Sequence, residues 1–440
     1  MPGPTTQTEA AGISAQRLAA DLKHSRARTL ALLSDLSAEQ LIGPRLPTLN
    51  PLRWEAGHLA WFHEHWILRQ LDGRAPLIAN TDALYDSTTI AHDTRWDLPL
   101  LSMPETLGYL HAVETALIER LITKPLSARD AYFYQLTIFH EDMHTEAFLY
   151  MRQSLGYPAP KLPDCDDAAH DAGPWPGDVV VPGGTLELGA KPEDGFVFDN
   201  EKWAHPVTVQ PFRIARAPVT NREYLAFVEA GGYTNRAYWD DTGWRWRDAA
   251  GLRAPVYWRQ RDGEWQARRF DRWEPLAPHG PVMHVSWHEA SAYCRYADRR
   301  LPTEAEWELA AACEPAEDRV AIRAGKRYYP WGDLTPSRLL ANLGDRIGCL
   351  DVGALPESDS AFGCRQMLGN VWEWTASDFF PYPDFEPDPY KEYSAPWFGT
   401  RKVLRGGSWA TPARLMRNTW RNFFPPERND IFAGFRTCAR

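Results

Sequence analysis

The sequence 127–156, SARDAYFYQLTIFHEDMHTEAFLYMRQSLG, decides how the N-terminal part of this chain folds. Ser127 is a good helix cap, apolar residues recur at helical spacing, and Gly156 is a typical helix end. The segment is therefore predicted to be one long helix, and it carries His140 and His144. Residues i and i+4 share one helix face and lie about 6 Å apart along the axis, so both imidazoles can reach one metal ion.

Three further helices are predicted upstream of this one. Apolar residues at helical spacing indicate helices over 14–36 and 103–122, and Pro51 suits the first turn of another that runs to Leu71. Residues 74–102 form an irregular crossover. Four helices with one long crossover are typical of a four-helix bundle, in which cofactor sites are built from inward-facing side chains.

The composition changes after the bundle. Residues 157–178 are rich in Pro and Asp, which predicts a linker. Residues 179–440 combine short β-like runs, brief helical pieces and many Gly, Pro and Trp, which predicts an α+β domain. The chain is thus predicted to be an α+β multidomain protein with a disordered tail over 1–13, the bundle over 14–156, the linker and the second domain.

Composition excludes several classes of function. The 440 residues carry a formal net charge of −10, which argues against binding nucleic acid by phosphate neutralisation. No apolar run approaches the ~20 residues that span a membrane, and the first residues show no secretory signal. Six scattered Cys without a C-x-x-C pattern fit reduced thiols. We expect a cytoplasmic enzyme whose partners are small molecules, neither nucleic acid nor membrane.

A metal site on the bundle needs a third ligand besides His140 and His144. The second helix offers three candidates, His58, His63 and His65. His58 lies among apolar residues and suits an inward position, whereas His63 and His65 flank a glutamate and are expected at the solvated edge. His65, seven residues from His58, is the reserve candidate. The preferred set is therefore His58, His140 and His144.

The identity of the metal stays open on spacing alone. Three neutral imidazoles with open coordination positions suit zinc, iron, copper or nickel. The pattern H-E-x-x-H at 140–144 also occurs in zinc proteases, where Glu141 would be the general base. That arrangement needs a further ligand shortly downstream, where this chain has its Pro/Asp-rich linker, so we disfavour it.

Segments along the whole chain resemble known families. WEAGHLAWFHE (54–64) and HEDMHTE (140–146) resemble the metal-binding bundle of DinB-like proteins. The second domain is similar to the formylglycine-generating-enzyme/sulfatase-modifying-factor family, which has a C-type-lectin-like fold. Its matching segments include PVTNREYLAF (218–227), PVMHVSWHEASAYC (281–294), RLPTEAEWELAA (300–311), MLGNVWEWT (367–375) and LRGGSW (404–409).

The combination of the two domains resembles the ergothioneine-type sulfoxide synthases. These are non-haem iron(II) enzymes that use O₂ to join a thiol to C2 of the imidazole of hercynine, which is N-trimethylhistidine. The resemblance implies Fe(II) as cofactor, held by His58, His140 and His144, with O₂ as co-substrate. Joining a chalcogen to an aromatic carbon with O₂ is redox chemistry, which Zn²⁺ does not perform.

The resemblance also implies substrate residues in the second domain. Asn422, Phe423 and Phe424 match a substrate-binding segment of the family, and aromatic rings suit a trimethylammonium group. Tyr382 matches a tyrosine of the family and is either a catalytic proton donor or a residue that packs a loop. Arg428 is a further candidate, either as a substrate contact or as part of a structural ion pair.

The crossover departs from the sulfoxide synthases that use γ-glutamylcysteine. Those enzymes carry two tyrosines and an Arg-rich run that grips the carboxylates of the substrate, whereas residues 86–96 here read DSTTIAHDTRW and keep only Arg95. A dianionic dipeptide needs bidentate Arg partners, so a neutral donor such as a sugar is favoured. The chain is therefore most similar to the selenoneine synthase branch, which couples a selenosugar to hercynine, with Arg95 as a substrate-binding candidate.

Other interpretations remain open. Within the family, the chain would join hercynine to cysteine or γ-glutamylcysteine. From other classes, it would be a zinc-dependent thiol S-transferase of the DinB type, or a lectin-like binding module with a structural metal. The three-histidine set has no obvious fourth protein ligand, which argues against a structural zinc site. A formylglycine-generating activity is disfavoured because no close Cys pair is present.

The 20 tryptophans divide between two expected roles. Trp54 and Trp61 flank His58 and are predicted to wall the metal site. Those in the motifs of the second domain are predicted to be scaffold, because a domain with few long regular elements can be packed by large rings; they are Trp287, Trp307, Trp331, Trp372, Trp374 and Trp409.

Overall fold

A computed structural model of the protein describes residues 12–163 and 165–440. The predicted disordered tail over 1–13 therefore lies outside the described residues except for its last two. The chain divides into two compact units. Unit 1 extends to Leu155 and includes Pro160–Pro163, and unit 2 takes Gly156–Ala159 and the rest of the chain to Arg440.

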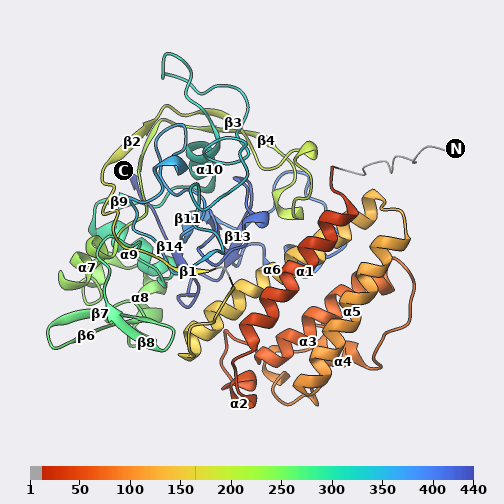
Figure 1. Cartoon of the computed structure of the whole chain (residues 1–440). Coiled ribbons are helices and arrows are strands. Elements are labelled where there is room, and N and C mark those ends of the chain that lie inside the picture. The colour runs from red at the N-terminus through yellow and green to blue at the C-terminus, as the bar shows by residue number, and fades with distance from the viewer. Residues whose placement is uncertain (1–11, 164) are drawn as a thin grey trace. The chain divides into compact units, whose positions relative to one another are not determined.

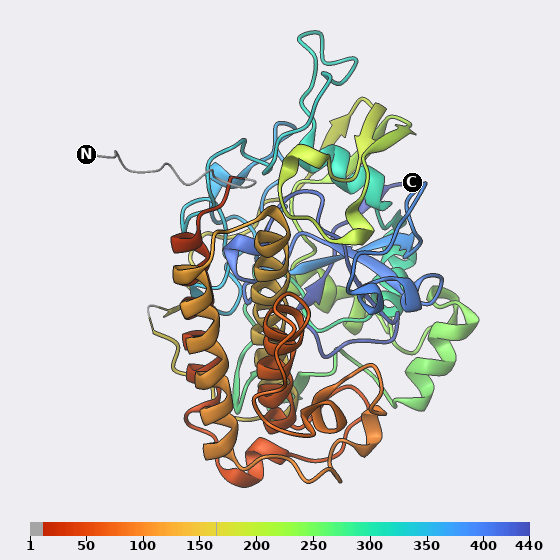
Figure 2. The same cartoon turned by 90° about the vertical axis from the view of Figure 1, so that its right-hand side faces the viewer.

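Unit 1 is built from long helices that run alongside one another (Figures 1 and 2). α1 and α3 each contact both α5 and α6, which gives a four-helix core. The α-helices are α1 (Ala15–Leu33), α2 (Ala38–Ile42), α3 (Leu52–His63), α4 (Thr81–Tyr85), α5 (Met103–Thr123) and α6 (Ala128–Leu155). α3 continues into a π-helical turn, η1 (Glu64–Arg69), and a 3₁₀ turn, η2 (His92–Thr94), lies in the crossover.

Side-chain caps explain where the long helices begin. The backbone N–H of Asp130 donates to Ser127 Oγ at 3.1 Å, which confirms Ser127 as the cap of α6. Ser14 caps α1, and Ser102 forms a reciprocal capping box with Glu105 at the start of α5. At the other end of α6, Gly156 takes the left-handed conformation (φ +65°) that favours glycine.

The crossover is more regular than predicted, and hydrogen bonds from α3 bind it. The indole N–H of Trp54 donates to Leu84 O at 2.7 Å, and that of Trp61 donates to Asp82 Oδ1 at 2.6 Å. Tyr85, at the end of α4, packs directly on Gly57, where a Cβ would come within 2.2 Å of the tyrosine ring. A glycine at this position therefore allows the crossover to approach α3 closely.

Unit 2 contains two four-stranded sheets and three smaller ones. One sheet has the order β13-β12-β11-β14 and the other β2-β5-β15-β9, while β3 pairs with β4 and β6, β7 and β8 form a meander. The strands are β2 (Asp178–Val181), β3 (Gly184–Leu188), β4 (His205–Val209), β5 (Phe212–Ala215), β6 (Trp258–Arg261), β7 (Glu264–Arg269), β8 (Arg272–Pro275), β9 (Arg299–Arg300), β11 (Trp372–Asp378), β12 (Lys402–Arg405), β13 (Asn422–Phe424), β14 (Ala433–Gly434) and β15 (Cys438–Ala439).

Short helices complete unit 2. The α-helices are α7 (Asn221–Glu229), α8 (Asp241–Ala249), α9 (Trp287–Tyr296) and α10 (Glu304–Ala312). The 3₁₀ turns are η3 (Pro192–Asp194), η4 (Asp199–Glu201), η5 (Arg236–Tyr238), η6 (Pro356–Ser358), η7 (Lys391–Tyr393), η8 (Ala395–Trp397) and η9 (Ala413–Leu415). Figure 1 shows these pieces joined by long irregular stretches.

Large rings and buried ion pairs fill the core of unit 2. Four of the predicted scaffold tryptophans are buried: Trp307, Trp372, Trp374 and Trp409. Trp287 and Trp331 are only half-buried. Buried guanidinium groups need carboxylate partners, and the core supplies them in the pairs Arg405–Glu308, Arg417–Glu201, Arg421–Glu304 and Arg436–Glu373.

Part of the segment predicted as a linker packs against unit 2. β1 (Asp166–Asp167) pairs in parallel with β10 (Arg346–Ile347). Nδ1 of His170 lies 3.0 Å from Asp351 Oδ1, and the N–H of Gly173 donates to the other oxygen of the same carboxylate. The domain boundaries given above stay predictions. Among the described helices, none has the length and apolar character needed to cross a membrane.

Candidate metal centre

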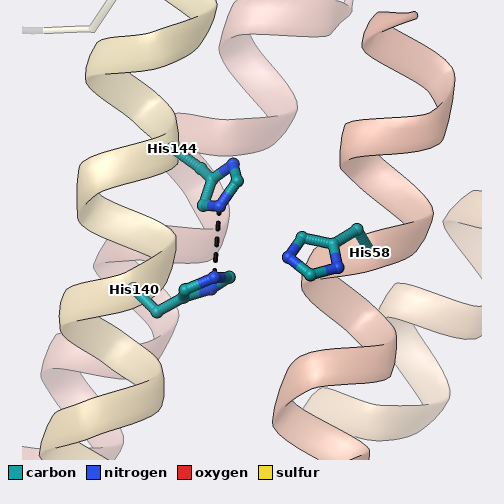
Figure 3. A group of neighbouring side chains, drawn as sticks. All are labelled: His58, His140 and His144. Carbon is teal, nitrogen blue, oxygen red and sulfur yellow. Dashed lines mark hydrogen bonds between the residues drawn. The ribbon is translucent and has the colours of Figure 1, made fainter. Parts of the chain in front are cut away.

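Three histidines from two helices of unit 1 face one another (Figure 3). His58 lies on α3, and His140 and His144 lie on α6. One ring nitrogen from each residue lies within 4.8 Å of those of the other two, and the Nε2 atoms of His140 and His144 are 3.1 Å apart. Two nitrogens bound to one ion at about 2.1 Å lie about 3 to 3.4 Å apart. The His140–His144 spacing therefore matches two ligands of one metal ion, and His58 lies within 4.8 Å of both.

The outer nitrogens of two of these rings have defined partners. Nδ1 of His58 lies 2.8 Å from the carbonyl oxygen of Tyr85, and Nδ1 of His144 lies 2.6 Å from Glu55 Oε2. A metal-bound histidine almost always donates its other ring N–H to a carbonyl or carboxylate. With Nδ1 protonated in both rings, the Nε2 atoms keep the lone pairs that a metal needs.

Burial keeps the site neutral enough to bind a cation. Burial and the neighbouring His144 lower the pKa of His58 to about 4, and burial lowers the pKa of His140 well below its usual value. Both imidazoles are therefore neutral at neutral pH, each with a single N–H. Burial alone would raise the pKa of Glu55, but His144 and the amide of Asn50 hold it at about 2, so this carboxylate is an anion.

Aromatic rings surround the histidines. The indole of Trp54 stacks on His58 with ring centres 5.0 Å apart and an interplanar angle of 8°, and Trp61 stacks on it at 5.8 Å. Phe62 stacks on His140 at 3.6 Å. The prediction that Trp54 and Trp61 wall this site is confirmed. Such a wall fixes the ring planes and excludes water from one side.

Glu141, the glutamate of the H-E-x-x-H pattern, is engaged elsewhere. It is 0 % exposed and accepts hydrogen bonds from Arg26 Nε at 2.8 Å and Thr29 Oγ1 at 2.7 Å. Nε2 of His63 lies 2.8 Å from its other oxygen. A carboxylate buried among these partners has no face left to activate a water, so the structure supports setting aside the zinc-protease interpretation.

The other histidines of α3 and η1, His63 and His65, are more buried than expected. The expectation that His63 lies at a solvated edge is wrong, because its side chain is 0 % exposed and its burial is offset by the Glu141 contact. His65 is half-buried, with its ring 4.9 Å from that of Trp61, and it is not part of the three-histidine group.

The partners of the ligand rings were not predicted from the sequence. Glu55 precedes His58 by three residues on α3, and residues three apart share a helix face, so this spacing was an available signal. Asn50 donates from Nδ2 to Glu55 Oε1 at 2.5 Å. Tyr85 contributes only its backbone carbonyl, for which a sequence has no local signal.

Arg95, predicted to bind substrate, has partners within unit 1. It is 9 % exposed and lies over the ring of Trp54 at 3.9 Å. Its Nη1 donates to Asn50 Oδ1 at 2.9 Å, and its Nη2 donates to the carbonyls of Ser87 and Ile90 at 3.5 and 3.3 Å. Its role toward a substrate stays a prediction.

The predicted substrate segment of unit 2 is β13. Asn422, Phe423 and Phe424 are all half-buried, and Phe423 stacks on Phe379 with ring centres 4.0 Å apart. Arg428 forms an ion pair with Asp430 at 2.5 Å and lies 5.1 Å over the Phe424 ring. Of the two roles considered for Arg428, the structure thus shows the structural ion pair.

Tyr382, the candidate proton donor, is buried inside unit 2. It is 6 % exposed, and its hydroxyl donates to Glu304 Oε2 at 3.4 Å. The guanidinium of Arg421 lies over its ring at 4.1 Å. Burial raises the pKa of Tyr382 far above its usual value, which opposes the release of its proton. The structure gives Tyr382 a packing role, and its catalytic role stays a prediction.

Comparison with known proteins assigns both units. Residues 21–147 match the DinB superfamily, and residues 166–440 match the sulfatase-modifying factor enzyme 1-like domain. The hercynine oxygenase of Mycolicibacterium thermoresistibile is 41 % identical over 95 % of this chain and 94 % of its own length. The chain belongs to the hercynine oxygenase family. The hercynine oxygenase of Mycobacterium tuberculosis is 39 % identical, over 96 % of this chain and 98 % of its own length.

Other relatives of this hercynine oxygenase family member match a smaller share of the chain. The formylglycine-generating enzyme of Thermomonospora curvata is 32 % identical over 60 % of this chain and 93 % of its own length. The predicted fold class, a DinB-like helical bundle followed by a formylglycine-generating-enzyme-like domain, is confirmed. The predicted resemblance to the ergothioneine-related enzymes is confirmed at the level of the family.

Proposed function

We propose that this protein is a non-haem iron(II)- and O₂-dependent oxidoreductase that joins C2 of hercynine to a selenosugar. The observation that carries the proposal is the convergence of three imidazoles, from His58, His140 and His144, in a chain of the hercynine oxygenase family. Three nitrogen ligands leave coordination positions open for substrates, as redox-active iron sites require. Bound iron would supply the activation of O₂.

The proposed reaction balances without a further reductant. One hydrogen leaves C2 of the imidazole and one leaves the selenol, and a C–Se bond forms. One oxygen atom of O₂ is transferred to selenium and the other is released as water with the two hydrogens. The four electrons that O₂ accepts therefore come from the new C–Se bond and from the oxidation of selenium.

The protein's own side chains have three tasks in this proposal. His58, His140 and His144 hold the iron, and Glu55 and the Tyr85 carbonyl orient two of those rings. Trp54, Trp61 and Phe62 keep water from that side. The substrate-binding residues proposed in unit 2 are Asn422, Phe423, Phe424 and Arg428, with Tyr382 as the proposed proton donor.

The Phe424 ring supports the cation-binding part of this proposal. It already has a guanidinium, that of Arg428, 5.1 Å from its centre. A trimethylammonium group would be attracted by the negative face of such a ring once the guanidinium no longer covers it, with a gain of about 0.5 to 2 kcal/mol that rises as the site excludes water.

The contacts of Arg95 support a neutral chalcogen donor. It is the one arginine of residues 86–96, and its guanidinium already donates to Asn50 and two backbone carbonyls. A dipeptide with two carboxylates needs bidentate arginines that face the substrate. A selenosugar needs none. The alternative within the family is a sulfoxide synthase that joins hercynine to cysteine or γ-glutamylcysteine.

A parallel turnover assay tests the proposal. Full-length protein is loaded with Fe(II) and incubated with hercynine and O₂ together with a selenosugar, cysteine or γ-glutamylcysteine. We expect the highest kcat/KM with the selenosugar, detected as a hercynine–selenium conjugate by mass spectrometry. A preference for a thiol donor would select the alternative. Full activity with Zn²⁺ and no O₂ would instead support a DinB-type thiol transferase.

A further inference from the structure

A chain of polar contacts connects the crossover to the outer nitrogen of His144. Arg95 Nη1 donates to Asn50 Oδ1 at 2.9 Å, and Asn50 Nδ2 donates to Glu55 Oε1 at 2.5 Å. The second oxygen of Glu55 lies 2.6 Å from His144 Nδ1. Four side chains from three separate stretches of the sequence thus form one continuous path that ends on a candidate ligand.

The chemistry of this path requires an amide in its middle. A guanidinium can only donate hydrogen bonds, and a carboxylate anion can only accept them. A residue that joins the two must accept on one side and donate on the other, as Asn50 does. Aspartate at this position would repel Glu55, and leucine would leave Arg95 and Glu55 each with an unfilled hydrogen-bonding site.

A second contact of the same arginine leads toward His58. The Arg95 guanidinium lies 3.9 Å over the Trp54 ring, whose indole stacks on His58 with centres 5.0 Å apart. The indole cannot turn freely, because its N–H donates to Leu84 O at 2.7 Å. Arg95 therefore connects with two of the three histidines. The path to His144 runs through Asn50 and the close Glu55–His144 contact, and the path to His58 runs through the stacked Trp54 ring.

Arg95 also holds the crossover itself. Its Nη2 donates to the carbonyls of Ser87 and Ile90, while the rest of the guanidinium faces Asn50 and Trp54. A displacement of residues 87–95 would thus move the guanidinium away from Asn50 and Trp54 together. This geometry makes the crossover part of the support of the candidate metal centre.

We propose that Arg95, Asn50 and Glu55 form a positioning relay that orients His144 and sets its strength as a metal ligand. The proposal rests on the metal centre of the proposed function. A carboxylate that accepts a hydrogen bond from Nδ1 increases the electron density at Nε2 and fixes the ring plane. Asn50 holds the carboxylate in that position, and Arg95 holds Asn50. The assignment gives Arg95 a positioning task in place of a grip on substrate.

The experiment measures Co(II) binding to the full-length apo-protein, because Co(II) reports its ligand geometry in its visible absorption. The test variants are Asn50→Leu, which interrupts the relay, and Arg95→Gln, which removes its cation. Arg45→Gln is the matched control. Arg45 also ties the bundle to the crossover, through Asp97 at 2.5 Å and Trp96 at 5.7 Å, but its side chain is 50 % exposed and touches no histidine.

We expect both test variants to bind Co(II) at least about tenfold more weakly than the wild type, the usual effect of losing a residue that supports a metal ligand. At saturating Co(II), their visible absorption bands should shift in position or intensity. Arg45→Gln should stay within about twofold in affinity and keep the wild-type spectrum. The saturated spectrum reports only folded, metal-bound protein, so a loss of folding alone cannot produce the shift.

Two results would overturn the relay. One is wild-type affinity in Asn50→Leu and Arg95→Gln. The other is weaker binding with an unchanged saturated spectrum, which would reduce both residues to a purely structural role. Wild-type protein that binds no Co(II) would instead overturn the proposed metal centre, and the relay with it. The failure of the inference and the failure of the proposed function are therefore separate outcomes.

Discussion

Neutralising Glu141 should destabilise unit 1 strongly while leaving the three histidines in place. The Glu141→Gln substitution keeps the size of the side chain but removes its charge. Its carboxylate accepts two hydrogen bonds from Arg26, at 2.8 and 3.1 Å, and one from Thr29, at 2.7 Å. Arg26 is 2 % exposed, so its charge would remain buried without its carboxylate.

The burial of Arg26 sets the size of the expected loss of stability. Removing one partner of a buried ion pair costs about 3 to 5 kcal/mol, because the other charge stays desolvated. The assay is urea unfolding of the full-length protein followed by circular dichroism at 222 nm, a signal to which the long helices of unit 1 contribute strongly. The matched control is Glu119→Gln on α5, whose side chain is exposed, and it should change stability by less than about 0.5 kcal/mol.

A general base would behave in the opposite way. If Glu141→Gln kept wild-type stability and metal affinity but lost all turnover, the buried ion pair would contribute little to the free energy of unfolding. The glutamate of the H-E-x-x-H pattern would then act on a substrate or water, and the zinc-protease interpretation would have to be reopened.

Three other perturbations have defined outcomes. Gly57→Ala places a Cβ 2.2 Å from the Tyr85 ring and should lower the free energy of unfolding by about 1 to 3 kcal/mol. It should also weaken Fe(II) binding in a chelator competition, because the Tyr85 carbonyl contacts His58. Burial raises the pKa of Glu289 from 4.5 to about 7, so the folded state holds this proton more tightly than the unfolded state does. The free energy of unfolding should therefore fall by roughly 3 kcal/mol as the pH rises from 4.5 through 7. Glu289→Gln should flatten this pH dependence of the denaturation midpoint, and an unchanged pH dependence would refute the role of Glu289. Removing metal with a chelator should lower the melting temperature of the wild type but not that of His140→Ala, and equal losses in both would contradict a metal held by His140.

The parts of the site that follow helical periodicity could be predicted from the sequence. His140 and His144 are four residues apart on one helix, and the apolar neighbours of His58 indicate an inward position. The four long helices and the cap at Ser127 were recognised for the same reason, since the signals are local.

The parts that depend on long-range contacts could not be predicted. His63 is polar and flanked by glutamate, which suggests exposure, and only the buried partner Glu141 on another helix explains its burial. The relay needs Arg95 to return to Asn50, forty-five residues earlier, and no periodicity encodes that return. In unit 2, the burial of Tyr382 depends on Glu304 and Arg421, which are equally remote in sequence.

Hercynine-dependent O₂ consumption by the Fe(II)-loaded protein, compared between the wild type and His140→Ala, decides whether the three histidines hold a reactive iron. The wild type should consume O₂ only when Fe(II), hercynine and a chalcogen donor are all present, and His140→Ala should lose both bound iron and O₂ uptake. Full iron content and full O₂ uptake in His140→Ala would contradict that role of the histidines.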